Sequence, residues 1–287
     1  MIQDIGSHVF DNAYRPLEAR PEDYVLAYGR GQAVVRLDGG TGELELPRLA
    51  DWGVPARHLA PRYLFSIDDR HFFLAERDPR PSGSEELPEG FGLEPVNQFR
   101  FLRPRCLAFA GITGYQLRNW YHSNRYCGHC GSELGHVATS RELACPACGN
   151  VLYPKICPAV IVGITNGDEL VMTKYAGRAY NHYALVAGFV EVGETLEQCV
   201  AREVREEVGL RVRNVRYYKS QPWPFTDTLL AGFFCDVDGD PTIHVDHDEL
   251  QLGGWVRRAD VPLDPADDSS LTNEMIALFA RGGEPRA

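Results

Sequence analysis

Three glutamates stand at a spacing that suits metal binding. Glu203, Glu206 and Glu207 occupy positions i, i+3 and i+4, so on a helix they would be surface neighbours with Cβ atoms about 5–6 Å apart. Hard cations such as Mg²⁺ prefer carboxylate oxygens, and a bound ion can polarise phosphate and activate water. The spacing alone equally fits a solvated acidic face paired with Arg202 and Arg205, so both interpretations stay open at this point.

Four cysteines form a second candidate centre. Cys127-Gly-His-Cys130 and Cys145-Pro-Ala-Cys148 enclose fourteen residues, a spacing with which two turns can present four thiolates to zinc. Because cysteines would fill all four ligand positions, the zinc would stabilise a small ribbon and leave no position for substrate. Two disulfides are the alternative.

Composition and charge limit the classes of protein and partner. The chain has 287 residues, of which 44% are hydrophobic and 24% charged, as expected of a folded globular protein. Forty acidic against 29 basic residues give a net charge of −11, which opposes general attraction to a nucleic-acid backbone. A polyanionic substrate would therefore need a local cationic or metal site. We see neither a signal segment nor a membrane span, and expect a cytoplasmic location without a membrane partner.

The glutamates are expected on a helix with well-marked ends. Thr195 and Gln198 have the spacing of a capping box, and Gly209 suits the left-handed residue that ends a helix. Apolar residues between these ends recur at helical spacing: Leu196, Cys199, Val200, Val204 and Val208.

The rest of the chain separates into a β-rich part and a mixed part. Strands are predicted before the cysteines at 24–28, 33–37, 43–49, 63–67 and 71–75, and after them at 159–165, 169–175, 183–190, 212–221, 229–238 and 253–258. Residues 77–95 are interpreted as a surface loop. A helix is predicted over 104–123, although Gly111 and Gly114 are unfavourable within it, and a final helix near 271–280.

The glutamate segment resembles the Nudix box, the signature of the Nudix hydrolase family. Residues 188–210, GFVEVGETLEQCVAREVREEVGL, fill every fixed position of that signature: Gly188, Glu194, Arg202, Glu203, Val204, Glu206, Glu207, Gly209 and Leu210. The resemblance implies an α/β/α sandwich and cleavage of a nucleoside diphosphate linked to another group. It also implies that the three glutamates hold Mg²⁺ or Mn²⁺ and that Arg202 and Glu194 orient the loop and helix.

A second segment resembles the NADH pyrophosphatase branch of this family, in which a zinc ribbon directly precedes the Nudix domain. The branch signature SQPWPFPxS is matched by SQPWPF, but Thr226 replaces its proline and Thr228 its serine. The resemblance implies a substrate site made by Gln221, Pro222, Trp223, Pro224, Phe225, Thr226, Asp227, Thr228 and Tyr153. The rings of Trp223 and Phe225 could stack on a flat base, and Gln221 could hydrogen-bond to it. Tyr153 could instead be structural.

The same resemblance adds two metal ligands. Glu249 is the best match to the branch's remaining metal-binding glutamate, with Asp246 and Asp248 as nearby competitors. Ala187, just before the box glycine, matches a position that offers a backbone carbonyl to the metal. The expected organisation is a β-rich N-terminal domain over 1–122, a zinc ribbon over 123–155 and a Nudix domain over 156–287.

The resemblance implies metal-dependent hydrolysis of the NADH pyrophosphate to AMP and reduced nicotinamide mononucleotide. NAD⁺ and the NAD cap of RNA 5′ ends carry the same bond, and the branch suggests a homodimer. One rival is an ADP-ribose or other nucleotide-sugar pyrophosphatase, which the change at Thr226 favours. The other is a zinc-ribbon binding module with a catalytically silent Nudix domain, for which a broken box would be the sign.

Overall fold

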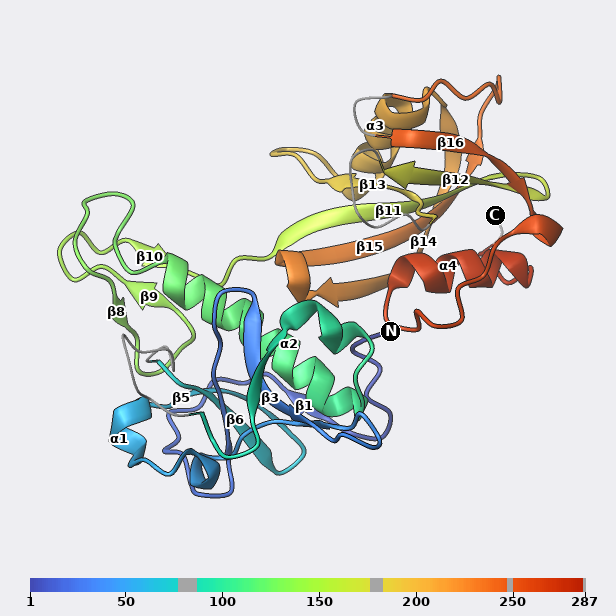
Figure 1. The fold of residues 1–287 in the computed structure, drawn as a ribbon. Helices are drawn as coiled ribbons and strands as arrows, with labels where there is room; N and C mark the ends of the chain where they lie inside the picture. Colours follow the sequence, from blue (N-terminus) through green and yellow to red (C-terminus); the bar gives the residue numbers. More distant parts are fainter. Residues whose placement is uncertain (77–86, 176–182, 247–249, 286–287) are drawn as a thin grey trace. The chain divides into compact units, whose positions relative to one another are not determined.

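The computed structural model describes residues 1–76, 87–175, 183–246 and 250–285, which form two compact units (Figure 1). One unit runs from Ile2 to Lys155 and includes residues 224–226; the other contains Met1, the chain from Ile156 to Trp223 and the chain from Asp227 onward. Within the described residues, no helix combines the length and apolar character needed to cross a membrane.

A mixed sheet forms the centre of the C-terminal unit. Its strands are β11 (Cys157–Asn166), β12 (Glu169–Tyr175), β13 (Val186–Phe189), β14 (Val212–Trp223), β15 (Thr228–Val237) and β16 (Leu250–Arg257), in the order β14-β15-β11-β12-β16. Strand β11 runs parallel to β15 along one edge. Its other edge is shared, because β13 pairs with residues 159–162 and β12 with residues 165–166.

Two helices cover the two faces of this sheet, as the alternation of β11 requires. Val160, Val162 and Ile164 pack with α3 (Leu196–Val208), whereas Ile161 belongs to the core cluster of α4 (Leu271–Ala280). Successive strand residues point to opposite faces, so a buried strand of this kind needs an apolar layer on each side. The predicted α/β/α sandwich is confirmed.

The N-terminal unit is β-rich, as predicted. One sheet has the order β1-β5-β6-β2 and the other β4-β3-β7. The strands are β1 (Phe10–Asp11), β2 (Tyr24–Leu26), β3 (Gln32–Leu37), β4 (Leu44–Glu45), β5 (Arg62–Ile67), β6 (Arg70–Leu74) and β7 (Gly92–Pro95). The prediction of a loop through residue 95 is wrong for β7, whose backbone pairs with residues 32–35 of β3. Short helices in this unit occur at α1 (Ala56–Leu59) and, as 3₁₀ turns, at Leu49–Trp52, Val96–Arg100 and Pro224–Thr226. In the C-terminal unit, Arg258–Asp260 forms another 3₁₀ turn.

The long helix α2 (Arg105–Ser123) confirms the prediction over 104–123 and explains its glycines. A Cβ on Gly111 would lie 2.5 Å from the Phe99 ring, and one on Gly114 would lie 2.5 Å from Leu26 Cδ1 and from the Tyr28 hydroxyl. The glycines therefore allow close packing of α2 on its neighbours, which offsets their low helix propensity.

A small three-stranded sheet forms the ribbon. Its order is β10-β9-β8, with β8 at Gly135–His136, β9 at Leu143–Ala144 and β10 at Val151–Leu152. Its buried side chains are Leu134, Leu143, Cys127 and Cys145, which pack with Trp120 of α2. So few apolar residues give a minor core, and a cross-link by metal is the usual remedy at this size.

Candidate active site and zinc site

The glutamate helix α3 begins and ends where the sequence predicts. The Thr195 hydroxyl accepts a hydrogen bond from the Gln198 amide (3.2 Å), and Gln198 Oε1 accepts one from the Thr195 amide (2.9 Å). At the other end Gly209 adopts a left-handed conformation with φ 73°. Both ends depend on local hydrogen bonds, so the helix is fixed by residues adjacent to it in sequence.

The three glutamates differ in exposure. Glu203 and Glu207 are buried, at 8% and 2% exposure, whereas the Glu206 side chain is 59% exposed. Buried carboxylates are costly unless they are paired with a cation or hydrogen-bonded. Two of the three therefore sit where a positive partner is required, which a solvated acidic face would not need.

Gly188 gives Glu203 the space it occupies. Gly188 lies in β13 opposite Val160, and a Cβ built on it would fall 1.9 Å from Glu203 Cδ and 2.0 and 2.3 Å from its two carboxylate oxygens. Any other residue at this position would displace the carboxylate. Glu203 can therefore occupy its place only because residue 188 is glycine.

Arg202 connects the loop to the helix through a set of ion pairs. Its Nε and Nη2 donate to the two carboxylate oxygens of Glu194 at 2.8 and 2.9 Å, and its Nη1 donates to Glu203 (2.7 Å) and Glu206 (3.0 Å). Nη2 also donates to the Phe189 carbonyl at 2.9 Å. Such a bidentate pair fixes both direction and distance.

The arginine also sets the charge state of the loop. Its hydrogen bonds to Glu194, with help from the Glu191 amide, lower the pKa of the Glu194 carboxyl to about 2. The same partner raises the pKa of Arg202 above its ordinary value. Both groups are charged at neutral pH. The backbone partners of this pair, the Phe189 carbonyl for Arg202 and the Glu191 amide for Glu194, could not be identified from the sequence.

The donor set suits a hard divalent cation. Three carboxylates on one helix face offer oxygen ligands only, the kind that Mg²⁺ and Mn²⁺ prefer. In the described part of the chain, however, the carboxylate oxygens of these glutamates do not lie close enough together to form a metal-binding group. Only the four cysteines form such a group among the described residues. Arg202 is the cation that contacts Glu203 and Glu206 in this structure.

The two further metal ligands implied by resemblance lie differently. Ala187 is on β13, in register with Ile161 and directly before Gly188. Glu249 lies outside the described residues, as does Asp248. The described chain just before them runs along the end of α3, because the Asp246 amide donates to the Glu207 carbonyl at 2.9 Å.

The SQPWPF segment spans the end of β14 and the turn after it. Trp223 is half-buried and pairs with Thr228, which is buried at the start of β15. Asp227 turns the chain with φ 57°. Within the N-terminal unit, half-buried Phe225 packs against the core that contains Phe99. The sequence suggested that the Phe225 ring could stack on a base, but in the structure this ring is partly engaged in core packing.

The other residues predicted to contact substrate vary in exposure. Pro222 and Thr226 are exposed and Pro224 is buried. Tyr153, which follows β10, is 68% exposed. Gln221 is fully buried, and its amide groups are bonded to the chain around the start of α4, so this side chain has a structural use that its sequence context does not indicate.

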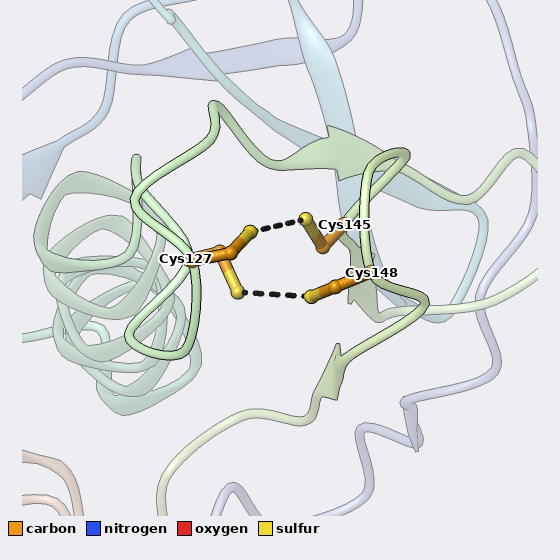
Figure 2. A group of neighbouring side chains, drawn as sticks. Cys127, Cys145 and Cys148 are labelled. Atoms are coloured by element: carbon orange, nitrogen blue, oxygen red, sulfur yellow. Dashed lines mark hydrogen bonds between the residues drawn. The ribbon is translucent and has the colours of Figure 1, made fainter.

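The four cysteines lie close enough together to share one metal ion; Cys127, Cys145 and Cys148 are labelled in Figure 2. Their sulfur atoms all lie within 4.8 Å of one another, with Sγ–Sγ distances of 3.6 Å from Cys127 to Cys148 and 3.4 Å from Cys130 to Cys145. Four thiolates about 2.3 Å from a zinc ion would be separated by about 3.8 Å, whereas a disulfide requires about 2.05 Å. All four are free thiols, so the disulfide alternative does not describe this structure.

Two equivalent turns hold the cysteine pairs. The Gly131 amide donates to the Cys127 carbonyl at 2.8 Å and the Gly149 amide to the Cys145 carbonyl at 2.9 Å, and both glycines are left-handed. Backbone N–H groups, that of Cys130 first, lower the pKa of the Cys127 thiol to about 6. Amides that stabilise a thiolate prepare it to bind zinc.

Comparison with known proteins agrees with both sites. A model of the NUDIX domain matches residues 155–279, and one of the NADH pyrophosphatase zinc ribbon domain matches residues 122–153. The chain is 42% identical to the NAD-capped RNA hydrolase NudC of Escherichia coli O81 over 199 residues, which are 69% of this chain and 77% of that protein. The chain belongs to the Nudix hydrolases with an NADH pyrophosphatase zinc ribbon.

Other family members are similar over shorter stretches. The NAD-capped RNA hydrolase NudC of Escherichia fergusonii is 41% identical over 170 residues, so the chain covers 65% of that protein's length, and 59% of this chain is matched. A solved NUDIX hydrolase from Nitrosomonas europaea is 22% identical, with 56% of this chain and 94% of that chain covered and a TM-score of 0.48. Family membership rests on the sequence relatives and the two domain models.

Proposed function

We propose that this protein hydrolyses the pyrophosphate bond of NADH, giving AMP and reduced nicotinamide mononucleotide. The observation that carries the proposal is the complete box geometry, in which Gly188 makes room for Glu203 and Arg202 joins it to Glu194. The names of the relatives, NAD-capped RNA hydrolases, support NAD as the group that is cleaved. An intact box speaks against a catalytically silent binding module.

We assign a part in this reaction to the charged residues of the box. When bound, Mg²⁺ or Mn²⁺ would neutralise the pyrophosphate and lower the pKa of a water molecule. Glu203, Glu206 and Glu207 would hold the ion, together with the Ala187 carbonyl and Glu249. Glu206 or Glu207 would accept the proton of the attacking water. Arg202 and Glu194 keep the loop and helix in register.

The zinc ribbon would contribute stability. Cys127, Cys130, Cys145 and Cys148 fill a four-coordinate site, so no position is left for water or substrate. The chemistry therefore belongs to the glutamate helix and the stabilising cross-link to the ribbon.

At the substrate end, we propose that Trp223 contacts a flat ring of the dinucleotide and that Pro222, Thr226, Asp227, Thr228 and Tyr153 are further substrate contacts. Trp223 is half-buried, and an indole ring is suited to stacking on a flat base. Pro224 and Phe225 would fix the turn, because Pro224 is buried and Phe225 is packed on one side.

NAD-capped RNA is a second substrate of the same site, since the same bond is cut. The net charge of −11 opposes general attraction of the RNA chain, so the cap rather than the RNA body should determine binding. We further propose a homodimer and a cytoplasmic location, the latter because thiolate ligands need a reducing compartment.

Thr226 favours one rival substrate. The branch has proline at this position, and an exposed threonine in its place leaves the turn less rigid. A looser turn would discriminate less against ADP-ribose, which has the same pyrophosphate and adenosine but no nicotinamide.

The test is a kinetic panel of NADH, NAD⁺, ADP-ribose and NAD-capped RNA with Mg²⁺ and with Mn²⁺. We expect the highest kcat/KM for NADH or the NAD cap. A preference of tenfold or more for ADP-ribose, roughly 1.4 kcal/mol, would contradict the proposed substrate in favour of the rival. A Thr226→Pro variant, which restores the branch residue, should then shift the preference back toward NADH.

A further inference from the structure

Gln221 belongs to the segment expected to contact substrate, yet its side chain is fully buried. Its Nε2 donates to the Ser269 carbonyl at 2.9 Å, and its Oε1 accepts from the Leu271 amide at 2.7 Å. Leu271 is the first residue of α4, where amides have no partner within the helix. One side chain therefore joins the end of β14 to the start of α4.

The segment that receives Gln221 is itself held firmly. Ser269 is fully buried, and Asp267, at 4% exposure, accepts hydrogen bonds from the Ser269 amide (3.1 Å), the Ser269 hydroxyl (2.6 Å) and the Ser270 hydroxyl (2.9 Å). Asn273 Nδ2 donates to the Asp264 carbonyl at 2.8 Å. The Ser269 carbonyl is thus a fixed anchor rather than part of a loose loop.

Two other side chains of β14, Tyr218 and Lys219, also bind α4. The Tyr218 hydroxyl and Lys219 Nζ both contact Glu274 Oε1, at 2.7 and 2.5 Å. Gln221 follows two residues later, and Trp223 two residues after that. The anchor therefore stands directly before the ring that we propose contacts substrate.

The chain beyond Gln221 is rich in proline. Pro222 and Pro224 flank Trp223, and proline has no amide hydrogen to donate to a neighbouring strand. Next to Gln221, Pro222 pairs with Leu229 and Trp223 with Thr228 of β15. The buried Gln221 side chain adds a second attachment, to the start of α4.

We propose that Gln221 is a positioning residue for substrate binding: by tying β14 to the start of α4 it fixes the backbone that carries Trp223. The proposal rests on the proposed function, because it takes Trp223 as a substrate contact. It replaces the direct contact between Gln221 and the nucleotide that the motif suggested. The expected consequence of losing the anchor is weaker substrate binding with unchanged chemistry, because the glutamates lie on a different helix.

The test compares Gln221→Leu, which removes both hydrogen bonds, with a control that removes a buried hydrogen bond elsewhere in the sheet. Thr165→Val is suitable, because the Thr165 hydroxyl donates to the Cys235 carbonyl at 3.0 Å near the opposite end of β15. For Gln221→Leu we expect KM for NADH to rise about tenfold while kcat stays within about twofold. Thr165→Val should leave both within about twofold.

The possible results distinguish failure of the positioning role of Gln221 from failure of the proposed function. A lower kcat with unchanged KM for Gln221→Leu means that the variant loses active protein rather than binding, and this overturns the proposal. A wild-type enzyme that does not cleave NADH contradicts the proposed function and this inference with it, whereas an active wild type with unchanged KM in the variant contradicts this inference alone. Should Gln221→Leu not fold, Gln221→Glu, which keeps an acceptor for the Leu271 amide, is measured with the same expectation.

Discussion

Replacing Gly188 by alanine tests how the fold places Glu203, the carboxylate that we propose holds the catalytic metal. The new Cβ would lie 1.9 Å from Glu203 Cδ, whereas ordinary contacts begin at 3.4 Å, so the carboxylate must move by about 1.5 Å. A displacement of about 1 Å at a reacting centre costs about 100-fold in rate, or about 2.7 kcal/mol of transition-state stabilisation. Stability should also fall, by about 1–3 kcal/mol, because the added methyl group overpacks a buried site.

The assay is kcat/KM for NADH together with the free energy of unfolding, measured on the same preparations. Gly163→Ala is the matched control, because its Cβ would lie 2.6 Å from the buried Phe234 ring in the α4 layer. We expect the control to lose stability but keep its rate within about twofold, and Gly188→Ala combined with Glu203→Gln to be no slower than Glu203→Gln alone. A Gly188→Ala enzyme with near-wild-type kcat/KM would refute the reasoning.

Three further predictions concern the zinc site, the loop and the helix. Cys145→Ser should reduce bound zinc, measured by elemental analysis, and lower the unfolding temperature; zinc content equal to the wild type would contradict the site. Because the pKa of Glu194 is lowered to about 2 from its ordinary 4.5, its ion pair should stabilise the fold above pH 4.5 and be lost as the pH falls toward 2. Unfolding curves of Glu194→Gln should therefore depend less on pH in that window, and an unchanged dependence would show that the pair is not formed. Arg202→Lys, which cannot make the bidentate pair, should lower kcat/KM about tenfold or more, and a rate equal to the wild type would remove Arg202 from the account.

The glutamate helix could be predicted from the sequence because its determinants are local. The capping residues Thr195 and Gln198 and the terminal Gly209 act within a few residues of the helix, and all three behave as predicted. The burial pattern of β11 likewise follows from its apolar run, since a strand covered on both faces needs no polar alternation.

Features that depend on distant partners could not be predicted in this way. Strand β7 has a weak sequence signal and exists because β3 offers its edge. Gly111 is unfavourable within a helix, and only the folded structure shows that glycine is needed there to make room for the Phe99 ring. Gln221 has the chemistry of a ligand contact, and only the folded chain shows that its amide binds the Ser269 carbonyl and the Leu271 amide around the start of α4.

The most direct test of the central claim is product analysis of NADH hydrolysis by the wild type and by Glu207→Gln. With Mg²⁺ or Mn²⁺, we expect equal amounts of AMP and reduced nicotinamide mononucleotide from the wild type. Because Glu207 is a buried carboxylate on the helix face that would hold the metal, the variant should be at least about 100-fold slower while unfolding like the wild type. No AMP from the wild type would show that the protein does not cleave NADH, and an equal rate in the variant would show that Glu207 is not needed for the reaction.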